Sequence, residues 1–109
     1  MKTNMKLVIV ALFNENILSD VLLALTSAFG SRVTILDAVA GTENLASVLP
    51  IFADFGGGHS RYCKLLFCPA DSDNPIEELQ AQLKLGRIPI QPEDWEVYVV
   101  PLDQVQLPE

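Results

Sequence analysis

The chain has 109 residues, half of them apolar, and its 14 acidic and 7 basic side chains give a net charge of −7. A single domain spanning 1–109 is expected, with residues 1–5 as an N-terminal extension. The few Lys and Arg residues are scattered and form no phosphate-binding stripe, so nucleic acid is not an expected partner. The first apolar run, at 7–13, is too short for a signal sequence or a membrane span, which predicts a cytoplasmic protein without membrane insertion.

The first part of the chain predicts a strand, a helix and a second strand. Residues 6–13, KLVIVALF, are apolar on both alternating sets, which is typical of a central strand. Asn14 is the expected cap of a helix whose apolar residues recur at three- and four-residue spacing, and Gly30 is its expected left-handed stop. Residues 32–39, RVTILDAV, predict a strand in which Asp37 interrupts the apolar pattern.

The remainder predicts a strand, a helix and a strand. Residues 61–69 and 95–101 read as strands, and between them Asn74 opens a helix that Gly86 closes. The order predicts the α+β class, specifically a ferredoxin-like βαββαβ sandwich with a long loop between its second and third strands. Three of the strands are apolar on both alternating sets. We therefore expect the sheet face away from the helices to be buried against other subunits.

The loop at 41–61 is too long for a hairpin turn and too rich in large apolar residues for a disordered segment. We expect it to pack, most plausibly on a neighbouring subunit. The glycine triplet at 56–58 is either a backbone that wraps an anion or a flexible return to the next strand. Gly41, at the end of a strand, lets a ligand or another chain approach closely.

The chain contains no nucleophile elbow, no His-Glu-x-x-His and no Walker loop, so an enzyme is not expected. The acidic residues within 71–78 stand at a helix start, where capping explains them better than catalysis or calcium binding. Cys63 and Cys68 are five positions apart in a predicted strand and point to opposite faces. A disulfide between them is therefore not expected, and inert buried thiols are.

Three segments together resemble the PII-like signalling family, the relatives of the nitrogen regulatory protein. They are KLVIVALFNENILSDVLLALTSAFGSRVTILDAV, LPIFADFGGG and VYVVPLDQV, and their order spans nearly the whole chain. The resemblance implies a homotrimer with ligand clefts between subunits. It also implies that 41–61 is the T-loop, which reports the ligand state to a regulated partner such as a transporter or an enzyme.

The resemblance also implies where an effector would bind. An adenine nucleotide (ATP, ADP or AMP) is the candidate effector, and no catalytic or metal-binding residue is implied. By this resemblance, the base of the T-loop, residues 37–42, would approach the nucleotide. The segment after the second helix would contribute one positively charged side chain. The implied binding residues are Asp37, Ala38, Val39, Gly41, Thr42 and Arg87.

Two other functions stay open from the sequence. One is a structural or interaction trimer in which the apolar loop is an assembly surface and no nucleotide is sensed. The other is a metal-binding trimer of the related divalent-tolerance type, in which His59 would act with Asp54 or Glu43.

Overall fold

The computed structural model describes residues 4–41 and 60–108. Its elements confirm the α+β class and are compatible with a small ferredoxin-like fold. Within these residues, two single-turn 3-10 helices, η1 and η4, accompany the longer elements. In chain order the elements are β1 (Lys6–Leu12), η1 (Glu15–Ile17), α1 (Leu18–Phe29), β2 (Thr34–Gly41), β3 (Ser60–Ala70), α3 (Pro75–Leu85), η4 (Pro92–Asp94) and β4 (Trp95–Pro101).

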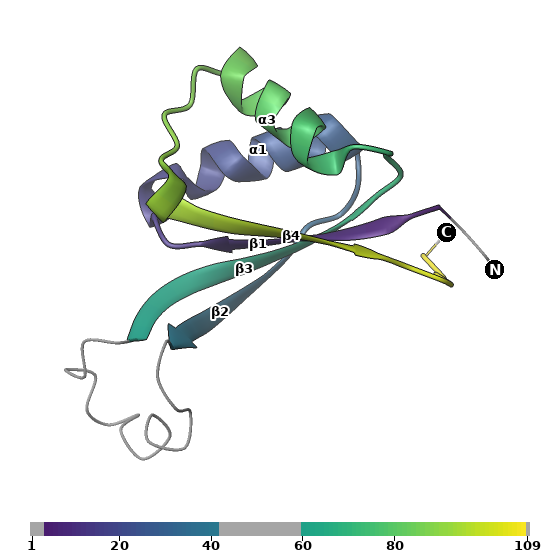
Figure 1. Cartoon of the computed structure of the whole chain (residues 1–109), viewed down its shortest axis with the longest axis horizontal. Coiled ribbons are helices and arrows are strands. Elements are labelled where there is room, and N and C mark those ends of the chain that lie inside the picture. The colour runs from purple at the N-terminus through teal and green to yellow at the C-terminus, as the bar shows by residue number, and fades with distance from the viewer. Residues whose placement is uncertain (1–3, 42–59, 109) are drawn as a thin grey trace.

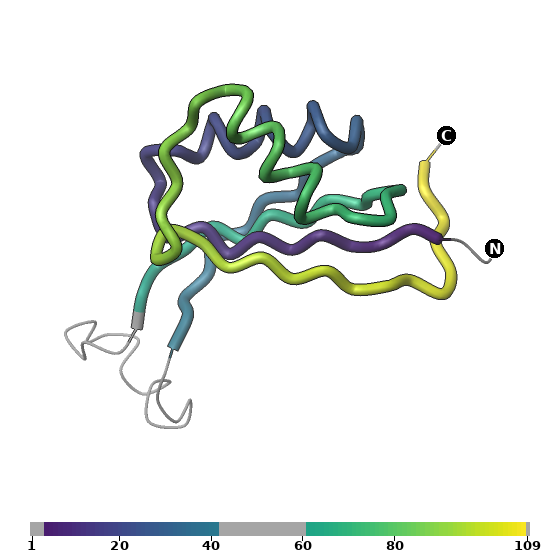
Figure 2. Tube along the Cα trace, turned by 45° about the horizontal axis from the view of Figure 1, so that its top comes forward, coloured from purple at the N-terminus to yellow at the C-terminus, as the bar shows by residue number. Residues whose placement is uncertain are grey.

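The four strands form one sheet in the order β2-β3-β1-β4, and every neighbouring pair is antiparallel. Both helices lie on the same side of this sheet (Figures 1 and 2). The two ends of the chain lie at one end of the sheet, whereas the ends of β2 and β3 that lead into 42–59 lie at the other (Figure 1). The second sheet face is left without a covering layer among the described residues.

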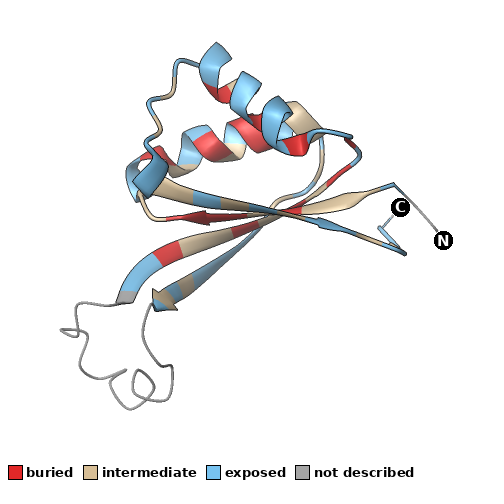
Figure 3. Ribbon diagram, viewed as in Figure 1, coloured by how far each residue is buried: buried red, intermediate tan, exposed pale blue. Residues whose placement is uncertain are grey.

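The hydrophobic core fills the space between the sheet and the helices (Figure 3). Alternate residues of β1 and β3 point toward the helices, as the two-residue period of a strand requires. Cys68 belongs to this core, whereas Cys63 lies on the opposite sheet face; both are free thiols, as predicted. The core residues with the least exposure are Val8, Val10, Leu12, Val21, Leu25, Leu66, Cys68 and Leu79.

The start of α1 differs from the prediction. The side-chain oxygen of Asn14 accepts a hydrogen bond from the Asn16 amide at 3.0 Å, so Asn14 caps η1 and not α1 itself. The chain thus makes one 3-10 turn before α1 begins at Leu18. The other end is as predicted, because Gly30 takes the left-handed conformation with φ 63°.

α3 ends as predicted, with Gly86 as its C-cap, but the left-handed residue is the next one along the chain. Gly86 keeps a right-handed φ of −81°, and Arg87 is the left-handed residue with φ 55°. The amide of Ile88 donates to the Leu83 carbonyl, and the Arg87 amide donates to the Lys84 carbonyl, each at 3.0 Å. This pair of bonds defines a Schellman motif, which needs its left-handed residue at position 87.

Two substitutions at these helix ends should have opposite effects. Arg87→Gly removes the cost of about 1–2 kcal/mol of a left-handed side-chain-bearing residue, partly offset by the entropy of glycine. A net stabilisation of about 0.5–1 kcal/mol is expected. Gly30→Ala creates the same cost and should destabilise by about 1 kcal/mol, although no atom lies within 4 Å of the added methyl group. Urea unfolding of both variants tests this, and a destabilised Arg87→Gly would contradict it.

Candidate functional site

The strands β2 and β3 continue beyond the end of β1. The last pair of β1 and β3 joins Leu12 to Lys64, but β2 and β3 remain paired as far as Gly41 and Ser60. Residues 38–41 and 60–63 therefore form a two-stranded ribbon that projects past the sheet, which we call the β2–β3 ribbon (Figure 1). Among the described residues β2 is an edge strand, and no strand pairs with its outer side there.

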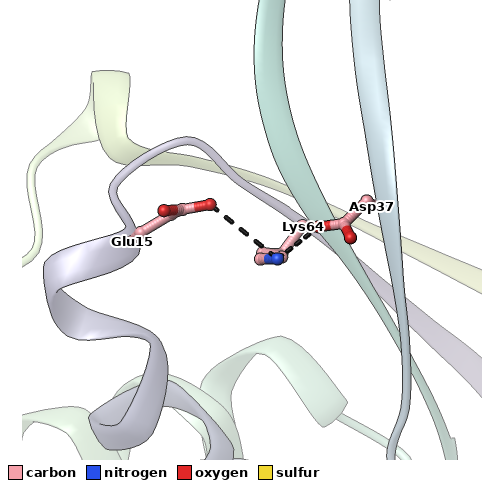
Figure 4. A network of polar contacts seen from close by, with 3 residues as sticks. All are labelled: Glu15, Asp37 and Lys64. Atoms are coloured by element: carbon pink, nitrogen blue, oxygen red, sulfur yellow. Dashed lines mark hydrogen bonds and ion pairs between the residues drawn. The ribbon is translucent and has the colours of Figure 1, made fainter.

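A polar network lies at the base of the ribbon (Figure 4). Lys64 of β3 forms a hydrogen-bonded ion pair with Asp37, its cross-strand partner on β2. The carboxylate of Glu15 in η1 lies 3.9 Å from the same ammonium group. The hydrogen bond to Asp37 raises the pKa of Lys64 above its ordinary value, and the charges of both carboxylates add to this effect. The network ties β2 and β3 to the turn after β1.

Sequence reasoning did not identify Lys64 and Glu15. Asp37 and Lys64 each interrupt an otherwise apolar strand, and this is the signal that could have paired them. Their pairing depends on the register of β2 against β3, which a long connection in the sequence does not predict. Glu15 joins them only because the chain makes the 3-10 turn η1.

An open hollow of ≈ 650 Å³ lies beside this network, where β1 ends and β4 begins. The Phe13 amide donates to the Asp94 carbonyl at 2.7 Å, and this bond holds the two strand ends together. The guanidinium of Arg61 stacks 4.3 Å from the centroid of the Phe13 ring. The lining combines aromatic rings with amide and carboxylate oxygens, which suits a planar ligand that carries hydroxyl or amino donors. The lining residues are Phe13, Asn14, Glu15, Asn16, Tyr62 and Asp94.

The predicted binding residues of β2 all lie at or beyond the base of the ribbon. Asp37 takes part in the network, with its side chain 83% exposed. Ala38, Val39 and Gly41 follow along the ribbon, and Val39 is 36% exposed. Thr42, the last of the predicted residues on this segment, lies outside the described residues.

Arg87 lies apart from these residues within one chain. It follows α3, and the hollows beside its neighbours Gly86 and Ile88 are lined by α1, α3 and residues 86–95. No β2 residue is among those lining residues. A site that uses both Arg87 and the ribbon would thus need a second subunit, as the sequence-based prediction supposes, and it stays a prediction.

In the part of the chain that the structure describes, no group of three or more His, Cys, Asp or Glu side chains is arranged to hold a metal ion. His59, Asp54 and Glu43, on which the metal-binding alternative rests, lie outside the described residues. No helix within 4–41 and 60–108 has the length and apolar content needed to cross a membrane.

Neither the family models nor the curated proteins compared with this chain give a match. The resemblance to PII-like proteins therefore rests on the sequence pattern alone.

Proposed function

We propose that this chain is a non-catalytic, PII-like regulatory protein with a ferredoxin-like βαββαβ fold. It assembles as a homotrimer and binds a small effector between subunits, with an adenine nucleotide as the candidate. Segment 41–61 passes the ligand state to a regulated partner. The observation that carries the proposal is the β2–β3 ribbon, which places Asp37, Ala38, Val39 and Gly41 on an open edge at the base of that segment.

The uncovered sheet face supports assembly. Cross-strand pairing assigns the residues to this face, since directly paired residues share a side of the sheet. Leu36, Tyr98 and Val100 are among the large apolar residues exposed on it, at 49%, 53% and 41%. A contiguous apolar face of this kind is typical of a protein interface. The residues of this face are Leu7, Ile9, Ala11, Thr34, Leu36, Ala38, Ala40, Arg61, Cys63, Leu65, Phe67, Pro69, Glu96, Tyr98 and Val100.

The charges at the ribbon support an effector that carries both an anionic group and hydrogen-bond donors. Lys64 supplies a positive charge, although within a single subunit it is already paired with Asp37 and Glu15. Arg87 of a second subunit would add an unshared positive charge for a phosphate. Asp37 can then accept hydrogen bonds from hydroxyl or amino groups of the ligand.

Light scattering and a thermal-shift panel with ATP, ADP and AMP test the proposal. The expected mass is about 36 kDa, three copies of 12.0 kDa. A nucleotide at a hundred times its Kd should raise the melting temperature by about 5 °C or more. Asp37→Asn and Arg87→Gln should reduce this shift and keep the trimer mass, and Arg32→Gln is the charge-matched control. A monomeric mass would refute the assembly, and no shift with any nucleotide would refute the effector.

A structural or interaction trimer without an effector is the second candidate, and the uncovered apolar face favours it. It predicts the same mass with no response to any nucleotide. The thermal-shift panel therefore separates it from the regulatory function.

A further inference from the structure

A second cavity, of ≈ 580 Å³, lies between α3 and the segment that leads from α3 to β4. Its volume falls within the range of about 300–1,000 Å³ that is usual for small-molecule sites. None of its lining residues belongs to the network of Lys64 or to the β2–β3 ribbon. The lining residues are Gln80, Leu83, Lys84, Ile88, Ile90, Gln91, Pro92 and Trp95.

The walls of this cavity are fixed by hydrogen bonds that backbone amides donate at both ends of the segment. At its start, the Schellman motif turns the chain so that Ile88 follows directly upon α3. At its end, the Gln91 amide donates to the Asp94 side chain at 2.8 Å, and the Asp94 amide donates to the Gln91 carbonyl at 3.0 Å. A ligand would meet a site that is already formed, which lowers the entropy cost of binding.

The left-handed conformation of Arg87 is unfavourable for a residue with a side chain, and it lies directly before the cavity wall. Such conformations cluster at functional sites, where the surrounding structure holds them in place. Here the conformation sets the chain direction that keeps Ile88 and Ile90 at the wall of the cavity.

The chemistry of the lining is apolar inside and positive at the rim. Leu83 is buried, and Ile88, Ile90 and Trp95 are half-buried against the core. The indole of Trp95 offers a ring on which a planar group can stack. Lys84 is the only charged residue of the lining, in a protein whose net charge is −7. The carboxamides of Gln80 and Gln91 add hydrogen-bond donors at the same rim.

We propose that this cavity, the Trp95 pocket, binds a small planar aromatic anion, with the ring on Trp95 and the anionic group at Lys84. An aryl carboxylate and an aryl phosphate share this chemistry. The proposal does not depend on the effector site at the ribbon, since no residue of β2 lines the pocket.

The chain has one tryptophan, so its indole N–H gives a single marker signal in a ¹H–¹⁵N NMR spectrum. Benzoate and phenyl phosphate are the two test ligands, and each stands for one source of the anion. A saturable shift of the Trp95 signal is expected with at least one of them, at millimolar concentrations. Benzamide is planar and neutral, and cyclohexanecarboxylate is charged and not planar. Each should bind at least about tenfold more weakly than the better of the two aromatic anions. No shift with either anion, or equal binding of benzamide, would overturn the proposal.

Lys84→Gln is the decisive variant, because Lys84 is exposed on a helix and its loss should not affect folding. About a tenfold loss of affinity for the anion is expected, and Lys84→Arg should restore most of it. Arg32→Gln removes the same charge from a surface outside the pocket and should leave the affinity unchanged. An equal loss in Lys84→Gln and Arg32→Gln would show only general electrostatic attraction and would overturn the site.

Discussion

Replacing Ile9 with glutamate is expected to convert the proposed trimer into folded monomers. Ile9 lies at the centre of the uncovered sheet face, directly between Phe67 of β3 and Tyr98 of β4. In the assembled protein the substitution would bury an unpaired carboxylate among apolar side chains. The cost is about 3 kcal/mol or more per chain, which weakens association at least about a hundredfold. Light scattering over a range of protein concentrations measures the change in mass.

The monomer should keep its fold because residue 9 points away from the core between the sheet and the helices. An unchanged far-ultraviolet circular dichroism spectrum would show this. Leu23→Glu is the matched control. Leu23 is 65% exposed on α1, on the helical side of the sheet, so the same new charge there should leave the mass unaltered. A trimer that persists in Ile9→Glu would place the interface elsewhere on the molecule.

The strands and helices could be predicted because their signals are local. β4 begins and ends as predicted, and Gly30 ends α1 as expected, since a strand period or a left-handed glycine acts within a few residues. Gly86 is likewise the C-cap of α3, as predicted. The left-handed conformation of Arg87 was not predicted, because it follows from the bonds that the carbonyls of Leu83 and Lys84 accept and not from the residue type.

The candidate sites were harder to predict because they depend on register and on irregular chain. The sequence directs attention to Asp37, but not to Lys64, which reaches it through the pairing of β2 with β3. The Trp95 pocket depends on the path of residues 86–94, and no repeating pattern marks that path. Thr42, His59 and the glycines at 56–58, for which the sequence also makes predictions, lie outside the described residues.

The stability of the fold should fall as the pH rises from about 9 to about 11, because the Cys68 thiol is buried in the core. Burial raises the pKa of Cys68 from its ordinary value of 9.0 to about 11. Between pH 9 and 11 the thiol ionises in the unfolded chain but stays protonated in the folded one. The free energy of unfolding therefore falls over this range, and the full contribution of the thiol is present only below pH 9. The loss should be on the order of 2 kcal/mol by pH 11. Urea unfolding at pH 7.5, 9, 10 and 11 measures the free energy of unfolding.

The raised pKa values of Cys63, Lys64 and Tyr98 act in the same direction, since the folded state holds those protons more tightly as well. The contribution of Cys68 is therefore read from a difference between variants. Cys68→Ala removes the buried thiol and should flatten the decline above pH 9, whatever its effect at neutral pH. Cys63→Ala, which removes the free thiol of the other sheet face, should keep most of the decline. Equal slopes in the wild type and Cys68→Ala would mean that the Cys68 thiol ionises as readily in the folded chain as in the unfolded one.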